Sequence, residues 1–258
     1  MALKSKIAVV TGAAMGIGRA VTEILLQNGA KVALLDVNET AGESLTEALN
    51  HQHGAGKALF LKCDVESEEQ IKAAFQRAVE TFGGVDLMCN NAGILNESAW
   101  EKAVSINLMG VIRGTYVGLE HMNKLTGGRG GIIINVASMA GIGPFLSCPV
   151  YTATKNGVVG FTRAMGAASE ASGYGIRFNV LCPSFVQTDF LSSIPEKLGQ
   201  FSHLGDAAQK LEEKLGILTV SEVAECFLEL AKDETKNGEA LLVLPKGKTY
   251  VKFPSFVQ

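Results

Sequence analysis

Residues 7–18 read IAVVTGAAMGIG, in which a short apolar run is followed by Gly12, Gly16 and Gly18. The apolar run predicts a buried strand, and apolar residues at helical spacing after Gly16 predict a helix over 16–28. Glycines at such a junction let the backbone approach a pyrophosphate and point a helix N-terminus at its charge. The G-x-x-x-G-x-G spacing is a relative of the dinucleotide-binding fingerprint, and a tight turn with close helix packing is the alternative interpretation.

Short apolar runs and amphipathic segments alternate along the rest of the chain. The runs predict seven strands, over 7–11, 32–35, 58–62, 85–90, 131–137, 176–181 and 240–244. The other segments predict helices over 16–28, 39–50, 67–82 (with a Ser67 cap and Gln70 three residues on), 100–124, 149–172 and 221–232. This alternation predicts a doubly wound α/β fold, a seven-stranded parallel sheet with helices on both faces. Nothing resembles a linker or a repeat, so we expect a single domain over 1–258.

The composition is typical of a globular protein. Of the 258 residues, 47% are hydrophobic and 19% are charged, which excludes a disordered or fibrous chain. The net charge is −3 and no run of five basic residues occurs, so nucleic acid is not an expected partner. No apolar stretch reaches the roughly 18–20 residues of a membrane-spanning helix, so we expect no membrane insertion.

The cysteines and histidines indicate neither disulfides nor a metal site. Five cysteines are an odd number and have no C-x-x-C spacing, which favours a reducing compartment. The first six residues lack the apolar core of a signal peptide, so a cytoplasmic location is expected. The four histidines form no recognisable ligand set. Two of them, His51 and His53, are predicted to lie in a solvated loop.

Asp36 ends the second predicted strand, eighteen residues after Gly18. An acid at this position can bind both hydroxyls of an adenosine ribose. Its charge would repel a 2′-phosphate, and the neighbouring Val37 offers no cation to bind one. The pair therefore favours NAD over NADP, with a helix cap as the alternative role of Asp36.

Two further strand ends offer cofactor contacts. Asp64-Val65 follows the third strand, where an acid and a backbone N–H can hold an adenine edge; a helix-capping Asp64 is the alternative. Asn90-Asn91-Ala92-Gly93 ends the fourth strand, where backbone at the switch point of the sheet can lie under a dinucleotide. An Asn-Gly type of turn is the alternative there.

Ser138, Tyr151 and Lys155 form a candidate group for oxidising an alcohol. Ser138 follows an apolar strand, and Tyr151 and Lys155 are four residues apart, on one face of a helix. Alcohol oxidation requires a base for the hydroxyl proton, and a nearby ammonium group would lower the tyrosine pKa from about 10 toward neutrality. Ser138 can hydrogen-bond the substrate oxygen. A Tyr-x-x-x-Lys pair alone is common by chance, and a structural role is then the alternative.

Together these motifs resemble the short-chain dehydrogenase/reductase family over residues 5–245. The motifs are TGxxxGxG at 11–18, NNAG at 90–93, Asn107, Ser138, YxxxK at 151–155 and the turn at Pro183. The resemblance implies a Rossmann-like fold and a catalytic tetrad of Asn107, Ser138, Tyr151 and Lys155. It also implies that Asn107 holds a water linking Lys155 to solvent through a bend in the long helix, and that Lys155 binds the nicotinamide ribose.

The resemblance also implies how the domain divides. The dinucleotide-binding half spans about 1–137, and the catalytic and substrate half spans about 138–258. NAD is expected to contact a set of residues from both halves: Gly12, Met15, Gly16, Ile17, Gly18, Asp36, Val37, Cys63, Asp64, Val65, Asn91, Ala92, Gly93, Tyr151, Lys155, Val186 and Thr188.

Segments such as LFLKCDV (59–65), GGIIIN (130–135) and GFTR (160–163) resemble an NAD-dependent branch of the family that oxidises 15-hydroxyprostaglandins. We therefore expect oxidation of a secondary hydroxyl on a lipid-like substrate, a 15-hydroxyprostaglandin or a hydroxylated fatty acid, to the ketone. The chain departs from this branch in having Cys148 for glutamine, Ile217 for tyrosine and Ser184 for glycine. The expected substrate-binding residues are Ser138, Cys148, Tyr151, Phe185 and Ile217.

Two other functions compete, an NADPH-dependent carbonyl reductase of the same fold and a non-catalytic dinucleotide-binding sensor. Asp36-Val37 argues against the first and the intact tetrad against the second. Residues 187–215, polar with interspersed Phe and Leu, are expected to form a mobile lid over the substrate. The predicted helices 100–124 and 149–172 carry small and apolar residues on more than one face, so a homodimer is expected.

Overall fold

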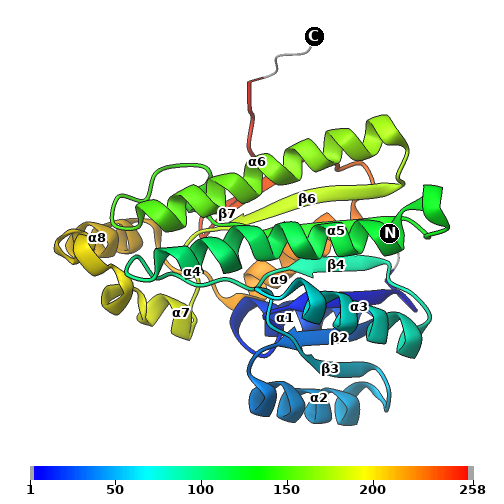
Figure 1. Cartoon of the computed structure of the whole chain (residues 1–258). Helices are drawn as coiled ribbons and strands as arrows, with labels where there is room; N and C mark the ends of the chain where they lie inside the picture. Colours follow the sequence, from blue (N-terminus) through cyan, green and yellow to red (C-terminus); the bar gives the residue numbers. More distant parts are fainter. Residues whose placement is uncertain (1–2, 255–258) are drawn as a thin grey trace.

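The computed structural model describes residues 3–254, which alternate between strands and helices (Figure 1). The first half contains β1 (Ile7–Thr11), α1 (Gly16–Gln27), β2 (Lys31–Asp36), α2 (Glu39–His53), β3 (Ala58–Lys62), α3 (Glu68–Phe82) and β4 (Leu87–Asn90). Next come α4 (Trp100–Val104), the π-helix η1 (Ser105–Gly110), α5 (Val111–Met122), the 3₁₀-helix η2 (Lys124–Thr126), β5 (Gly131–Val136), the 3₁₀-helix η3 (Met139–Gly141), α6 (Pro149–Ser172) and β6 (Ile176–Pro183). The last part contains α7 (Asp189–Ser192), the 3₁₀-helices η4 (Ile194–Lys197) and η5 (Gly199–Leu204), α8 (Gly205–Leu215), α9 (Val220–Lys232), β7 (Ala240–Leu244) and β8 (Gly247–Tyr250).

The sheet has eight strands in the order β3-β2-β1-β4-β5-β6-β7-β8. The seven predicted strands are all present and pair in parallel, which confirms the doubly wound arrangement. The eighth strand, β8, pairs antiparallel with β7 across a two-residue turn and was not predicted. Gly247-Lys248-Thr249-Tyr250 is an almost fully exposed edge strand and has no apolar alternation, so hydrophobic periodicity could not identify it.

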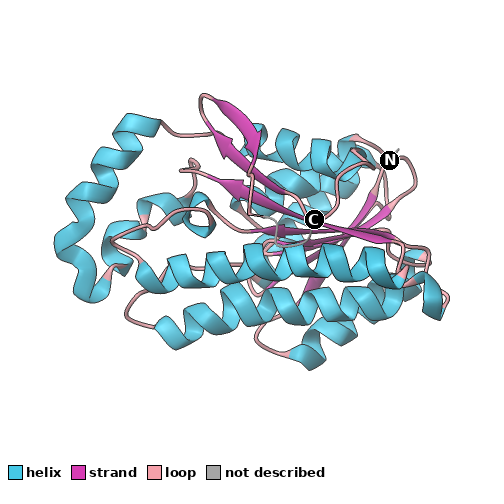
Figure 2. Ribbon diagram, turned by 90° about the horizontal axis from the view of Figure 1, so that it is seen from above, coloured by secondary structure: helices cyan, strands magenta, loops and turns pink. Residues whose placement is uncertain are grey.

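Side-chain alternation along the strands decides which helices cover which face. In β1, Ala8 and Val10 belong to the core built with α1, α2 and α9, whereas Ile7 and Val9 belong to the core built with α3, α5 and α6. Helices therefore cover both faces of the sheet, as Figure 2 shows. This double burial explains the nearly continuous apolar sequence of the central strands.

Two helical predictions need correction. The predicted helix 100–124 is interrupted by the π-helical turn η1, which separates α4 from α5. Helix α2 extends to His53, so His51 and His53 lie in its last turn and not in a loop. The polar stretch 187–215 is mostly helical, from α7 to α8, and we call it the lid segment.

Other features bear on partners and cofactors. Among residues 3–254, no helix combines the length and apolarity needed to cross a membrane. The same residues contain no group of three or more histidine, cysteine or acidic side chains placed to hold a metal ion. The five cysteines are all free and buried.

Candidate active site

The predicted motifs meet at the edge of the sheet where the parallel strands end. Strands β1 and β4 are neighbours, and the chain leaves them toward opposite sides, which makes their carboxyl ends the switch point of the sheet. Thr11, at the end of β1, pairs with Leu35 of β2, and Asn90, at the end of β4, pairs with Asn135 of β5. The glycine loop, Asp36, the NNAG segment and Ser138 therefore lie along one edge.

The glycine loop has the geometry that a bound pyrophosphate requires. Gly12 and Gly16 have φ of +62° and +54°, a region that side chains disfavour. A Cβ on Gly18 would collide with the carbonyl oxygen of Gly12. In the described structure, the N-cap residue of α1, Met15, makes no side-chain hydrogen bond to the helix. The first turn of α1 contains no acidic residue. The first-turn N–H groups can therefore bind an anion.

Asn91 holds this loop in place through its side chain. Its Nδ2 donates to the carbonyls of Thr11 (3.0 Å) and Gly12 (3.1 Å), and the Thr11 hydroxyl accepts from the N–H groups of Asn91 and Ala92. A Cβ on Gly12 would lie only 2.9 Å from the Ala92 Cα. The side chain of Asn91 thus binds protein backbone, and the segment Asn91-Ala92-Gly93 lies against the glycine loop, where it was predicted.

Asp36 is 8% exposed and fixes the same loop from the other side. One carboxylate oxygen accepts from the Ala14 N–H and the other from the Asn38 N–H, both at 2.9 Å. Asn38 is the cap of α2, so the alternative role of Asp36 as that cap is wrong. Val37 is 60% exposed at the rim. The nearest cross-strand cation, Lys62, is paired with Glu39 at 2.8 Å.

The residues after β3 form a tight turn. The Asp64 carboxylate accepts from the Glu66 N–H (2.9 Å), while Cys63 and Val65 are buried. Ser67 caps α3 by accepting from the Gln70 N–H, as predicted, and the Gln70 side chain instead accepts from the Asp64 N–H. Because Ser67 supplies the cap, the alternative role of Asp64 as a helix cap is wrong.

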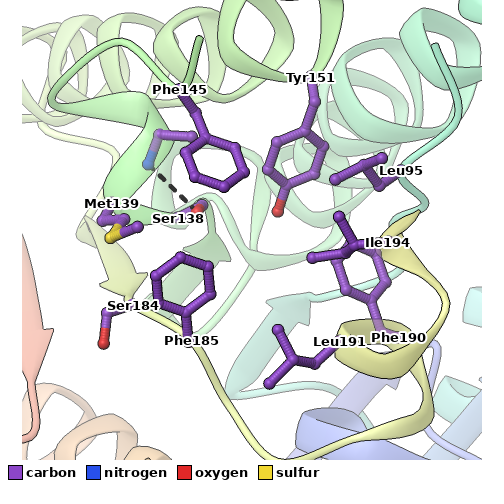
Figure 3. A pocket seen from close by; sticks show the side chains of 11 residues that line it. Leu95, Ser138, Met139, Phe145, Tyr151, Ser184, Phe185, Phe190, Leu191 and Ile194 are labelled. Atoms are coloured by element: carbon purple, nitrogen blue, oxygen red, sulfur yellow. Dashed lines mark hydrogen bonds between the residues drawn. The ribbon is translucent and has the colours of Figure 1, made fainter. Parts of the chain in front are cut away.

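Ser138, Tyr151 and Lys155 come together behind the sheet edge. The Ser138 and Tyr151 side chains line the same cavity, and the Ser138 oxygen accepts from the Ala140 N–H at 3.2 Å, the dashed line in Figure 3. The Lys155 ammonium donates to the Val136 carbonyl at 3.0 Å and lies 5.6 Å from the centre of the Tyr151 ring. The three side chains predicted from β5 and α6 are therefore neighbours.

Burial governs the protonation of this group. It raises the pKa of Tyr151 to about 12, and the neighbouring Ser138 hydroxyl opposes that rise. It lowers the pKa of Lys155 to about 8. The prediction that Lys155 lowers the pKa of Tyr151 is wrong for this structure, because removal of the phenolate from water is the largest influence on that pKa and Lys155 is not among its causes.

Asn107 lies in the π-helical turn and is fully buried. Its side chain accepts from the Ile94 N–H (2.8 Å), donates to the Ile94 carbonyl (2.7 Å) and contacts the Thr154 hydroxyl (3.3 Å). A Cβ on Gly93 would lie 3.3 Å from Asn107 Oδ1 and 3.4 Å from Lys155 Nζ. Asn107 and Lys155 therefore both border Gly93, and Asn107 lies in the π-helical turn.

Two cavities adjoin each other near the active site, and Tyr151 lines the smaller one. The smaller, about 60 Å³, is lined by Ser138, Tyr151 and mostly apolar side chains, which Figure 3 shows surrounding the tyrosine hydroxyl. The larger, about 570 Å³, lies against the lid segment. Their shared walls are Phe145, Phe185, Leu191 and Ile194. Phe185, an expected substrate residue, thus lies at the boundary between the two cavities. The lid segment supplies part of their apolar wall through Leu191 and Ile194.

Two of the five expected substrate residues line neither cavity. Cys148 is fully buried, packs with Phe145 and Tyr151, and has its sulfur 3.6 Å from the Ser147 hydroxyl. Ile217 is 46% exposed beyond α8. Cys148 lines neither cavity because, three positions before Tyr151, it is packed at the buried start of α6, and Ile217 lines neither because it lies at the surface. Ser184, in contrast, lines the smaller cavity.

The start of the lid segment contacts the glycine loop. Val186 forms a bridge with Leu218, and Thr188 caps α7. The Thr188 methyl group would lie 3.4 Å from a Cβ on Gly16. Thr188, which also lines the larger cavity, therefore lies between that cavity and the glycine loop.

The sequence analysis missed Glu97, in the loop after β4. This carboxylate is 7% exposed and accepts from the N–H groups of Tyr151 (2.9 Å) and Val150 (3.1 Å). One signal was available: Cys148, the residue before α6, has no oxygen to cap a helix, so an acceptor had to come from elsewhere. Nothing local in the sequence says which acid supplies it.

Comparison with known proteins agrees with this geometry. Residues 6–199 match the family model for short chain dehydrogenase. The chain is 44% identical over 262 residues to 15-hydroxyprostaglandin dehydrogenase [NAD(+)] of Rattus norvegicus (99% of this chain, 98% of that one), and 44% identical over 245 residues to the Homo sapiens protein of that name (94% and 92%). Two solved structures are similar: a Burkholderia phymatum short chain dehydrogenase/reductase in complex with NAD (30% identity, TM-score 0.78, 89% and 86% covered) and levodione reductase (29%, 0.82, 93% and 96%). This chain belongs to the short chain dehydrogenase family.

Proposed function

We propose that this chain is an NAD-dependent dehydrogenase that oxidises a secondary hydroxyl of a lipid-like alcohol, such as a 15-hydroxyprostaglandin or a hydroxylated fatty acid, to the ketone. The observation that carries the proposal is the convergence of Ser138 and Tyr151 on an apolar cavity that adjoins a larger one. The names of the rat and human relatives support both the cofactor and the substrate class.

The residues at the sheet edge fit a dinucleotide. NAD, when bound, accepts a hydride from the carbinol carbon. The uncapped start of α1 and the glycine loop would hold its pyrophosphate. Asp36 would hold the adenosine ribose. Its buried negative charge would repel a 2′-phosphate, since no ion pair neutralises it among the described residues and the nearby Lys62 is paired with Glu39. Lys155 would hold the nicotinamide ribose.

Tyr151 takes the hydroxyl proton in this proposal. Its hydroxyl faces the smaller cavity beside Ser138, so one substrate oxygen can reach both groups. Ser138 orients that oxygen, and Tyr151 acts as the general base. Lys155, with a pKa of about 8, exchanges protons readily near neutral pH. The proton then leaves past Lys155 and Asn107, which both border Gly93.

The cavities favour a long, mostly apolar substrate. Phe145, Phe185, Leu191 and Ile194 surround the path from Tyr151 to the space under the lid segment. A cavity of about 570 Å³ is large enough for a lipid chain, and binding sites for such ligands are mostly apolar. The substrate carbon would be held in the smaller cavity and the chain in the larger.

The test is NAD reduction with a panel of secondary lipid alcohols that includes a 15-hydroxyprostaglandin. Tyr151→Phe removes the proton acceptor and should lower kcat at least about 100-fold, while NADH binding stays within about twofold. Tyr174→Phe, a partly buried tyrosine outside both cavities, is the matched control. A Tyr151→Phe rate above about a tenth of wild type, a loss below about 1.4 kcal/mol, would exclude Tyr151 as the base.

A further inference from the structure

Glu97 is a buried carboxylate in the loop between β4 and α4. Both of its oxygens are occupied by backbone donors from the first turn of α6: Oε1 by the Tyr151 N–H and Oε2 by the Val150 N–H. Burying a carboxylate is costly unless it is well hydrogen-bonded, and these two bonds supply that compensation. The acid therefore has a defined structural partner, the start of the helix that carries Tyr151.

The start of α6 depends on this acid. The helix is 24 residues long, and its N-cap residue Cys148 makes no side-chain cap in the described structure. Pro149, at the first helical position, has no N–H, so Val150 and Tyr151 carry the first free donors. A carboxylate at this end also complements the helix dipole. Glu97 thus fixes the height and rotation of the turn from which the Tyr151 side chain projects.

The backbone beside the same acid contacts the lid segment. The Glu97 N–H donates to the Lys197 carbonyl at 2.8 Å. The next residue, Ser98, is so close to Gly199 that a Cβ there would lie 2.6 Å from the Ser98 Oγ. Gly199 also has a φ of +53°. One short loop therefore binds the lid segment with its backbone and the first turn of α6 with its side chain.

We propose that Glu97 is a positioning residue. Its side chain fixes Tyr151 beside Ser138, and its backbone couples the position of Tyr151 to the position of the lid segment. This inference rests on the proposed function, because it assigns Glu97 a role through the proposed base. Glu97 lines neither cavity. Its removal should therefore act on kcat through the placement of the tyrosine hydroxyl, and leave cofactor binding unchanged.

The experiment compares Glu97→Ala, Glu97→Gln and the control Glu101→Gln, an exposed acid in the first turn of α4. The measurements are kcat and KM for the NAD-dependent oxidation of a lipid alcohol, NADH binding, and hydrogen exchange of the Val150 and Tyr151 amides. Glu97→Ala should lower kcat about tenfold or more, with NADH binding within about twofold. Glu97→Gln keeps one acceptor, so its kcat should lie between Glu97→Ala and wild type. The two amides should exchange at least about tenfold faster in Glu97→Ala than in the control.

Other results would overturn the proposal. A folded Glu97→Ala with wild-type kcat would overturn the proposal, as would uniformly faster exchange along all of α6, which indicates a role in stability alone. If Glu97→Ala does not fold, Glu97→Gln decides: its kcat must fall at least about threefold below that of Glu101→Gln. If wild type oxidises no alcohol with NAD, the proposed function fails, and unchanged exchange at the two amides would independently show that Glu97 does not hold them.

Discussion

At the scale of single residues, the proposed base is a tyrosine whose surroundings oppose its ionisation. Burial raises the pKa of Tyr151 to about 12, above its ordinary value of 10, while Lys155 is brought down to about 8. The active form is the deprotonated one, and its fraction grows as the pH rises toward the pKa. The sign of the pH dependence follows: oxidation should be faster in alkaline solution.

We therefore expect kcat/KM for alcohol oxidation to increase between pH 7 and pH 10, by up to about tenfold per pH unit where tyrosine ionisation limits the rate. The measurement is a pH–rate profile at saturating NAD, with protein stability followed in parallel. A flat profile over this range would show that Tyr151 is already ionised, or that proton transfer does not limit the rate.

Asp36 should decide between the two nicotinamide cofactors. Asp36→Asn removes the charge that opposes a 2′-phosphate and keeps one oxygen for the Ala14 or Asn38 N–H. The ratio of kcat/KM for NADP to that for NAD should rise about tenfold, equivalent to about 1.4 kcal/mol. Glu43→Gln, an exposed acid on α2, is the control. An unchanged ratio would leave Asp36 with a purely structural role in the glycine loop.

At the scale of elements, the lid segment packs against the loop after β4 at Gly199, which lies beside Ser98. Gly199→Ala strains a residue with positive φ and must displace Ser98, so η5 should move away from the loop after β4. The KM for the lipid alcohol should rise at least about threefold, and NADH binding should stay unchanged. Gly143→Ala is the control, because a Cβ on Gly143 would meet nothing within 4 Å and Gly143 lines neither cavity. Equal KM values for the two variants would contradict this packing.

Hydrogen exchange tests the expected motion of the same element. If residues 187–215 form a lid, their amides should exchange more slowly when NADH and a ketone product are present. Equal protection with and without both ligands would contradict a closing lid.

At the scale of the whole molecule, we expect two chains to pair through α5 and α6. Tyr116 and Met109 are exposed apolar residues on the α5 side, and Gly160 and Ala164 leave room on the outer face of α6. Sedimentation at micromolar concentration should give the mass of a dimer, and Ala164→Glu should give a monomer. Ala55→Glu, in an exposed loop, is the control. A monomeric wild-type chain would contradict the pairing.

The charge around the larger cavity should influence which lipids are oxidised. Among its described lining residues the only charged side chains are Asp206 and Glu212, and neither has a described ion pair. A lipid whose far end is neutral should therefore be preferred over its free acid, with kcat/KM for a methyl ester about threefold higher or more at low salt. Asp206→Asn combined with Glu212→Gln should remove that preference, and Glu213→Gln should not. Equal rates for acid and ester would contradict this effect.

Local patterns were sufficient for much of this protein. The seven parallel strands, the glycine loop, Asp36 and the trio Ser138, Tyr151 and Lys155 were all predicted where the structure has them. Each depends on properties encoded over a few residues: apolar periodicity, backbone freedom at glycine, and the four-residue spacing that places two side chains on one helix face. Parallel topology then brings the strand ends together, because all parallel strands end at the same edge.

Tertiary structure decided the rest. The cap supplied by Glu97, the exclusion of Cys148 from the cavities and the raised pKa of Tyr151 all depend on contacts between segments far apart in the chain. The edge strand β8 forms only because β7 offers it a partner. The sequence by itself determined which groups reach the sheet edge. Which of them are buried, and which acceptor each donor finds, was decided by the packing of distant segments, since desolvation and hydrogen bonding depend on neighbours in space.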